Sequence, residues 1–410
     1  LRKVDEFEFR PERAEEALRW LDSYLFQWRG VTPTAEDISF RFGLRSPVFK
    51  ATLGELHALW RGVCGEPSAR TKFDEWSALL RTVYGSEVGS EELFLRHTYL
   101  ASLSRLLAFF ALCGRPPREG EIEGVITGDA FKRLGFHNLV EDDFFAWPVM
   151  PGARERAKAL MAALSGRLSI YDLSEVRQDL LKELYQELVD PHDRHDLGEF
   201  YTPDWLAQRL LDMMEGGRFR GDPDKRVLDP ACGSGTFLVL AIKRIREYAA
   251  EQMLPEARVL ERVLSNVVGF DLNPLAVIAA RTNYLLALGD LLQHRAGEIT
   301  IPVYLCDSIM TPREGEDMFG KGMVRFNTAV GPFTVPKSLV QAQYIDKLAD
   351  FLEEAVFLDL SKEQFVNRLC DAFPLIPDKD QKDIQAVYEL YEKLQNLQRQ
   401  GINGIWARII

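Results

Sequence analysis

The fold of this 410-residue chain is decided by the stretch Val227-Leu-Asp-Pro-Ala-Cys-Gly-Ser-Gly-Thr-Phe237. Residues 226–228 are typical of a short buried parallel strand, and Pro230 ends it because proline has no N–H to donate to a sheet. Gly233 and Gly235 allow a tight turn, and the apolar run 236–245 predicts a helix. The free N–H groups of that helix point into the turn. The pattern therefore predicts a strand, glycine loop and helix that hold a small anionic or polar ligand.

The run 229–237 resembles the S-adenosylmethionine loop of amino-methylating DNA methyltransferases, in particular the N6-adenine (N-6 DNA methylase) family of restriction-modification systems, including their type IIG-like members. The alternative is a dinucleotide-binding fingerprint, which needs a third glycine where this chain has Leu238. The resemblance implies a Rossmann-like methyltransferase fold with S-adenosylmethionine as its cofactor. The cofactor-binding residues that it implies in this loop are Asp229, Ala231, Cys232, Gly233, Ser234, Gly235, Thr236 and Phe237.

A second motif, Gly198-Glu-Phe-Tyr-Thr-Pro203, resembles the segment that closes over the methionine end of the donor in the same family. The resemblance implies Glu199, Tyr201 and Thr202 as further cofactor-binding residues. Thr202 is also expected to cap a helix over 204–214 with Pro203 at its first position. The nearby His192 and His195 lack a further Cys or His, so no metal site is expected.

Two more strands are expected at 263–270 and 299–306, each followed by an acidic residue. Asp271 lies where a carboxylate accepts hydrogen bonds from the two ribose hydroxyls of a nucleoside, although an acid there can also simply cap the next helix. Asn273 belongs to the same turn and is counted with the cofactor-binding residues. The family resemblance adds Asp307 and Ser308 beside the adenine ring.

Composition describes an ordinary globular chain of two or three domains, with 46% hydrophobic and 27% charged residues. We expect a cytoplasmic protein, because we find no apolar run of about 20 residues, no signal peptide and no paired spacing among the five cysteines. The net charge of −12 disfavours tight duplex binding, which depends on Lys and Arg that neutralise phosphates. The main DNA-reading parts are therefore expected outside these residues, and Leu1 in place of Met suggests a fragment.

Residues 1–168 are expected to form a helical N-terminal domain, because apolar residues recur there at helical spacing. The expected helices are 11–28, 46–61, 73–84 and 91–112. The last of them is apolar on nearly every side, which predicts a central buried helix with His97 as a core residue. Residues 119–151 contain four glycines and an aromatic cluster, and predict an irregular flap.

The rest of the chain gives an α/β fold class with a helical insertion. Residues 169–310 are expected to be a partial methyltransferase core that begins with a long amphipathic segment over 172–189. Residues 311–410 are expected to hold a hairpin at 322–336 and helices at 337–360, 361–371 and 379–400. The end, 403–410, resembles the helix before the catalytic strand of the family.

No Asn-Pro-Pro-Tyr, Asp-Pro-Pro-Tyr or similar tetrapeptide occurs in the sequence, and Asn273-Pro274 lacks the second proline. In the family this motif holds the flipped adenine and its N6 atom, so we assign no catalytic residue and expect these residues to be inactive alone. The resemblance implies a parent adenine-specific DNA methyltransferase that binds double-stranded DNA and associates with restriction or specificity subunits, without a membrane. Cytosine-N4 methylation, protein-glutamine methylation, a nuclease in the same polypeptide and a non-catalytic donor-binding or assembly module remain open.

Overall fold

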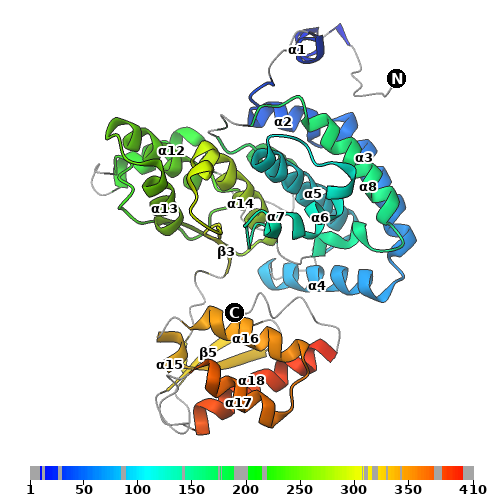
Figure 1. Ribbon diagram of the computed structural model, residues 1–410. Coiled ribbons are helices and arrows are strands. Elements are labelled where there is room, and N and C mark those ends of the chain that lie inside the picture. The colour runs from blue at the N-terminus through cyan, green and yellow to red at the C-terminus, as the bar shows by residue number, and fades with distance from the viewer. Residues whose placement is uncertain are drawn as a thin grey trace. The chain divides into compact units, whose positions relative to one another are not determined.

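The protein is mostly helical, with a small parallel sheet in the first of two compact units, Leu1–Ser308 and Ile309–Ile410 (Figure 1). The computed structural model describes residues 10–11, 14–25, 30–84, 89–140, 144–173, 176, 178–188, 202–214, 219–306, 308, 313–315, 322–328, 331–341, 344–373 and 381–399. The predicted helix at 403–410 lies outside the described residues.

The first unit begins with helices, as the apolar spacing predicted. They are α1 Ala14–Leu25, α2 Ala35–Phe42, α3 Pro47–Val63, α4 Pro67–Tyr84, α5 Glu91–Cys113, η2 Glu119–Glu121, α6 Ile122–Thr127, α7 Asp129–Arg133, η3 Phe144–Val149 and α8 Arg154–Leu168. Local capping sets several boundaries. The Ser90 side chain accepts a hydrogen bond from the N–H of Leu93 at the start of α5, and Gly114, with φ of 64°, ends that helix.

The prediction of an irregular flap at 119–151 is wrong. Gly120 and Gly124 lie inside the short helices η2 and α6, and Gly128 separates α6 from α7 with φ of 95°. Phe131, Phe145 and Trp147 have no exposed surface, because the short helices pack their apolar side chains into the core around α5.

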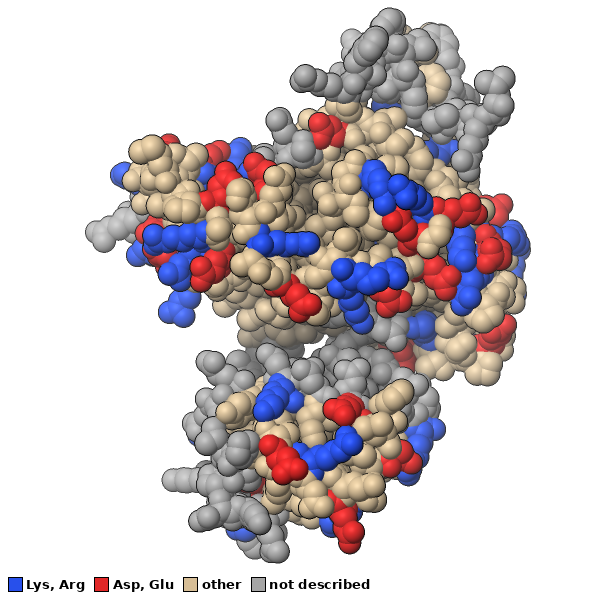
Figure 2. All heavy atoms as spheres, in the orientation of Figure 1, with Lys and Arg blue, Asp and Glu red and all other residues tan. Residues whose placement is uncertain are grey.

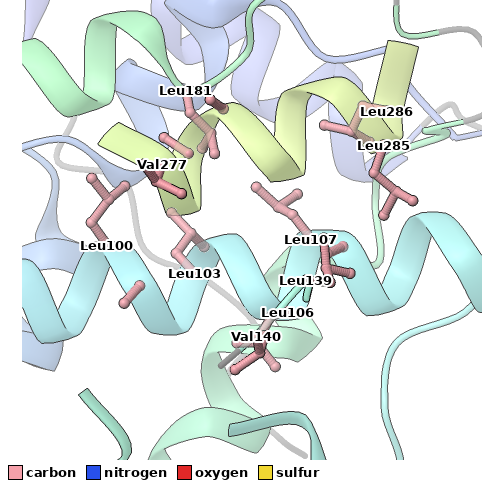
Figure 3. Packing of buried hydrophobic residues seen from close by; sticks show 14 of the residues in the cluster. Leu100, Leu103, Leu106, Leu107, Leu139, Val140, Leu181, Val277, Leu285 and Leu286 are labelled. Carbon is pink, nitrogen blue, oxygen red and sulfur yellow. The ribbon is translucent and has the colours of Figure 1, made fainter. Parts of the chain in front are cut away.

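Helix α5 packs against α14, Pro274–Leu288, and this seam joins the helical region to the sheet (Figure 3). Figure 3 shows Leu103 and Leu107 of α5 next to Val277 and Leu285 of α14, and all four side chains are buried. The predicted central buried helix is thus confirmed, and one hydrophobic core runs through both regions.

His97 is also a core residue, as predicted. The Trp76 Nε1–H donates to its Nδ1 at 3.3 Å, and burial lowers the pKa of His97 to about 3, which keeps the ring neutral.

The span Pro274–His294 is long and apolar enough to cross a membrane by length and composition, although the sequence analysis expected no such run. Within its most apolar window, 78% is buried inside the protein. Its apolar character is explained by its position in the core, against α5.

Three parallel strands in the order β1-β2-β3 form the sheet: β1 Val227–Asp229, β2 Val267–Asp271 and β3 Val303–Leu305. The helices of this region are α9 Lys182–Leu188, α11 Asp204–Met213, α12 Thr236–Glu251, α13 Glu256–Asn266, α14 and η5 Gly289–His294. The strand predicted at 263–270 starts later, because Val259, Leu260 and Val263 are the buried face of α13.

The strand predicted at 299–306 is reduced to β3, since residues 299–301 pair instead with the helical region. Ile299 bridges to Phe136, and the side chain of Asn138 bonds both backbone groups of Ile301, donating at 2.7 Å and accepting at 2.8 Å. An asparagine side chain thus takes the place of a neighbouring strand.

In the amphipathic segment at 172–189, only α9 is helical among the described residues. The chain before α9 turns inward instead, and this turn buries Asp179 beneath the glycine loop.

The second unit has its own antiparallel sheet and its own core. The hairpin predicted at 322–336 is confirmed as β5 Met323–Thr328 and β6 Gly331–Pro336, and β4 Arg313–Gly315 pairs with β5. The helices are α15 Lys337–Gln341, α16 Ile345–Phe357, α17 Lys362–Ala372 and α18 Gln381–Arg399, so the helix predicted at 337–360 is two helices. Phe333, Leu352, Phe365 and Tyr391 belong to the core of this unit.

Candidate functional site

The glycine loop lies between β1 and α12, at the carboxyl edge of the parallel sheet. Gly233 and Gly235 have φ values of 55° and 95°, a region that side-chain-bearing residues rarely adopt. The N–H of Cys232 donates to the carbonyl of Phe270 in β2 at 2.8 Å, and the N–H of Gly235 donates to the carbonyl of Cys232 at 2.8 Å. The loop is therefore tied to the neighbouring strand in the conformation that its glycines permit.

Asp271, at the end of β2, is half-buried and accepts hydrogen bonds from the backbone of the glycine loop and of the turn after β2. Its Oδ2 accepts from the N–H of Gly233 at 2.8 Å, and its Oδ1 accepts from the N–H of Asn273 at 2.8 Å. Each carboxylate oxygen can accept more than one hydrogen bond, so this arrangement suits ligand hydroxyls as well.

The helix cap at this turn is Asn273, and the alternative role of Asp271 as the cap is therefore excluded. The Oδ1 of Asn273 accepts from the N–H of Leu275 at 2.9 Å, and its Nδ2 donates to the hydroxyl of Tyr185 at 2.8 Å. The side chain of Asn273 is only 4% exposed. Its Oδ1 thus caps α14, and its Nδ2 connects the turn to α9.

Asp229, at the end of β1, carries a polar atom that the described residues leave without a partner. Its Oδ1 accepts from the N–H of Ala231 at 3.2 Å, whereas its Oδ2 is buried and has no hydrogen bond within the described part of the chain. Burial raises the pKa of Asp229. A buried acceptor without a donor is costly, so this oxygen fits a ligand N–H or ammonium group.

Ser234 and Thr236 turn their side chains inward, away from the open side of the loop. Both hydroxyls donate to Oδ2 of Asp179, at 2.5 and 2.8 Å. Burial raises the pKa of Asp179 to about 6, although these two hydrogen bonds oppose the shift. Sequence reasoning missed Asp179, because its apolar neighbours have helical spacing and its partners lie far away in the sequence.

The remaining predicted residues have varied surroundings. Cys232 is 6% exposed, and burial raises the pKa of its thiol, so it stays protonated. The helix cap expected at Thr202 is wrong: Pro203 is the N-cap of α11, without a side-chain hydrogen bond, and the carbonyl of Thr202 accepts from Lys182 Nζ at 2.9 Å. Ala231 and Ser308 are exposed, and Phe237 is half-buried. The predicted residues Glu199, Tyr201, Asp307, His192 and His195 lie outside the described residues.

The site thus combines a small parallel sheet, a glycine loop after β1 and acidic residues at the ends of two adjacent strands. In α/β proteins, nucleosides and nucleotides bind at this edge of the sheet. Residues 176–314 match the family model described as N-6 DNA Methylase. The matched segment contains Asp179, the glycine loop and Asp271.

Two curated relatives match parts of the chain. One is the adenine-specific methyltransferase PglX of Streptomyces coelicolor, 35% identical over 112 residues, which are 26% of this chain and 9% of that protein. The other is the methylase subunit of the type I restriction enzyme MjaVII of Methanocaldococcus jannaschii, 26% identical over 145 residues, which are 35% of this chain and 21% of that subunit. The matched regions thus span about a tenth and a fifth of these relatives.

Solved structures give weaker likenesses. The DrdV–DNA complex has a TM-score of 0.40 at 19% identity, covering 63% of this chain and 24% of that chain. The type ISP restriction-modification enzyme LlaBIII bound to DNA has a TM-score of 0.36 at 13% identity, covering 67% of this chain and 18% of that chain.

Proposed function

We propose that this chain is the S-adenosylmethionine-binding portion of a DNA adenine-N6 methyltransferase from a restriction-modification system. The observation that carries the proposal is the pair Asp229 and Asp271, which end adjacent strands on either side of a glycine loop within the segment that matches the N-6 DNA methylase model. An acidic residue before the glycine loop and a second one at the end of the next strand suit a nucleoside with a cationic amino-acid end.

The chemistry of these residues fits the methyl donor. Asp271 would accept from the ribose hydroxyls, and the lone buried oxygen of Asp229 would accept from an ammonium group. Gly233 and Gly235 would let the ligand approach the backbone closely. When bound, S-adenosylmethionine supplies a methyl group on a positively charged sulfur, and the two carboxylates favour a cationic ligand. Thr202, Ser308 and the predicted Glu199, Tyr201 and Asp307 complete the proposed site.

We further propose that DNA binds through the full-length protein rather than through these residues alone. On the face in Figure 2, the blue and red side chains of the described residues are interspersed. On α8, Lys158 lies 3.2 Å from Glu123 and Arg156 lies 3.0 Å from Glu55, so acidic neighbours offset its positive charge. Residues 1–410 also contain no Asn-Pro-Pro-aromatic motif, so we expect donor binding without methyl transfer. A cytoplasmic location and association with restriction or specificity subunits belong to the same proposal.

Calorimetry with S-adenosylmethionine and the Asp271→Ala variant tests the proposal. Loss of hydrogen bonds to a charged acceptor costs about 1.5–3 kcal/mol, so the affinity should fall by about 10- to 150-fold. The matched control is Asp224→Ala. Asp224 precedes β1, at the opposite edge of the sheet, and pairs with Arg258 and Arg262 at 3.0 and 2.9 Å.

The control should bind like the unaltered protein, and both variants should keep its circular dichroism spectrum. Equal affinities for the two variants would refute the role of Asp271. Tighter binding of NAD than of S-adenosylmethionine would refute the assignment of the donor site.

A further inference from the structure

Asp179 is held beneath the glycine loop by residues that lie far from it in the sequence. Besides the hydroxyls of Ser234 and Thr236, the Nδ2 of Asn283 in α14 donates to its Oδ1. Asn283 Nδ2 also donates to the carbonyl of Ser234 at 2.9 Å. Asp179 is 4% exposed and Asn283 is fully buried. Asp179 and Asn283 thus hold the glycine loop through its side chains and through its backbone.

Two residues on the following helix reach two other parts of the donor site. Lys182 donates to the carbonyl of Thr202 at 2.9 Å and to Asp204 at 2.6 Å, which fixes the start of α11. The hydroxyl of Tyr185 accepts from Asn273, two residues after Asp271. Asp179, Lys182 and Tyr185 therefore contact three separate segments that contain proposed donor-binding residues.

The ionised form of Asp179 is costly to the fold. A buried carboxylate loses its hydration, and its three partners here are neutral donors. Of the charged groups that act on it, Lys182 favours the ionised form and Asp204 opposes it. Because Lys182 is itself paired with Asp204, it compensates only in part. A neutral residue of the same shape would be tolerated by the fold at least as well.

We propose that Asp179, Lys182 and Tyr185 form a brace that holds the three donor-binding segments in place, with Asp179 as the positioning residue for the glycine loop. This inference rests on the proposed donor site. Ser234 and Thr236 flank Gly235, so fixing them fixes the glycine between them and the first turn of α12. Without the brace the loop samples other conformations, and the apparent affinity falls with the fraction of protein in the competent one.

The main test compares Asp179→Asn and Asp179→Ala with the unaltered protein in calorimetry with S-adenosylmethionine and in urea unfolding at pH 7.5. Asparagine keeps the shape and an acceptor for Asn283 but gives weaker, uncharged bonds to the loop. We expect its affinity to fall about five- to tenfold while its unfolding midpoint stays equal or rises. We expect Asp179→Ala to lose more than about tenfold, because all three hydrogen bonds are gone.

A pH profile separates a positioning role from a structural one. Burial sets the pKa of Asp179 at about 6, so the affinity of the unaltered protein should fall as the pH drops from 7.5 to 5.5 and Asp179 takes up a proton. Asp229 also has a raised pKa, but it is present in both proteins, so its effect cancels in the comparison. The Asp179→Asn variant should therefore show a shallower pH dependence.

Tyr185→Phe removes a single hydroxyl from the brace, and we expect the affinity to fall a fewfold. Absence of donor binding by the unaltered protein would refute the proposed function itself. With that binding present, equal affinity and pH profile in Asp179→Asn would refute the brace. If affinity and unfolding midpoint fell together in that variant, the brace would also be refuted, because a purely structural residue would give this result.

Discussion

Replacing Gly235 with alanine tests the geometry of the glycine loop directly. Gly235 has φ of 95°, and a left-handed conformation costs an L-residue about 1–2 kcal/mol. An added Cβ would lie 3.3 Å from both Cα and Cβ of Ala280 in α14, and overpacking of this kind costs about 1–3 kcal/mol. We expect Gly235→Ala to lower the free energy of unfolding of the first unit by about 2–5 kcal/mol and to weaken donor binding.

The control is Gly54→Ala, in the middle of α3, where an added Cβ meets no atom within 4 Å. Alanine is the better helix former, so this variant should be more stable by about 0.5–1 kcal/mol. Urea unfolding followed by tryptophan fluorescence measures both effects, because Trp60, Trp76 and Trp147 are buried in the core of the first unit.

The double variant with Ala280→Gly separates the two costs at Gly235. Removing the methyl group of Ala280 relieves the contact with its Cβ but leaves the contact with its Cα and the backbone strain, so the double-mutant cycle should recover only part of the loss. Stability and affinity of Gly235→Ala equal to those of the unaltered protein would refute the loop geometry.

Two further predictions follow from the sheet edge and from the absent motif. Asn138→Ala removes both hydrogen bonds to Ile301 and should lower the free energy of unfolding in urea by about 2 kcal/mol. The control is the neighbouring His137→Ala, which loses a surface pair with Glu298 and should change stability by less than about 0.5 kcal/mol. In a tritiated-methyl assay on unmodified genomic DNA, residues 1–410 should incorporate no label. Incorporation would mean that an unrecognised residue carries the chemistry, with Asn327 and residues 331–333 as the candidates.

Local patterns predicted the elements that depend on neighbouring residues. The strand, glycine loop and helix at 227–245 formed as expected, because proline, glycine and the apolar run each restrict their own backbone. Helix α5 was likewise evident from an apolar surface that only a buried helix can satisfy. The hairpin of β5 and β6 also pairs strands that are close together in the sequence.

Elements that depend on contacts between distant residues could not be predicted from local sequence patterns. Val263 reads as the start of a strand, yet it is the last buried residue on the inner face of α13. Asp179 lies among apolar residues at helical spacing, but its partners Ser234, Thr236 and Asn283 are 55, 57 and 104 positions away. No local pattern encodes such a network. The cap of α14 could not be assigned from the sequence for a related reason. Asp271 and Asn273 are both good caps, and only the three-dimensional contacts distinguish them.

The helical region and the part of the chain that carries the proposed donor site share one hydrophobic core and form one compact unit. The seam between α5 and α14 buries leucines from both, and Glu187 of α9 accepts from Ser39 at 2.5 Å and from the N–H of Leu44 at 3.2 Å. Asn138 completes the hydrogen bonding beside β3. The N-6 DNA methylase match begins at residue 176, so a chain cut there would expose the apolar face of α14 and release α9, which carries Lys182 and Tyr185. The helices before residue 176 therefore pack directly against the elements that carry the proposed donor-binding residues.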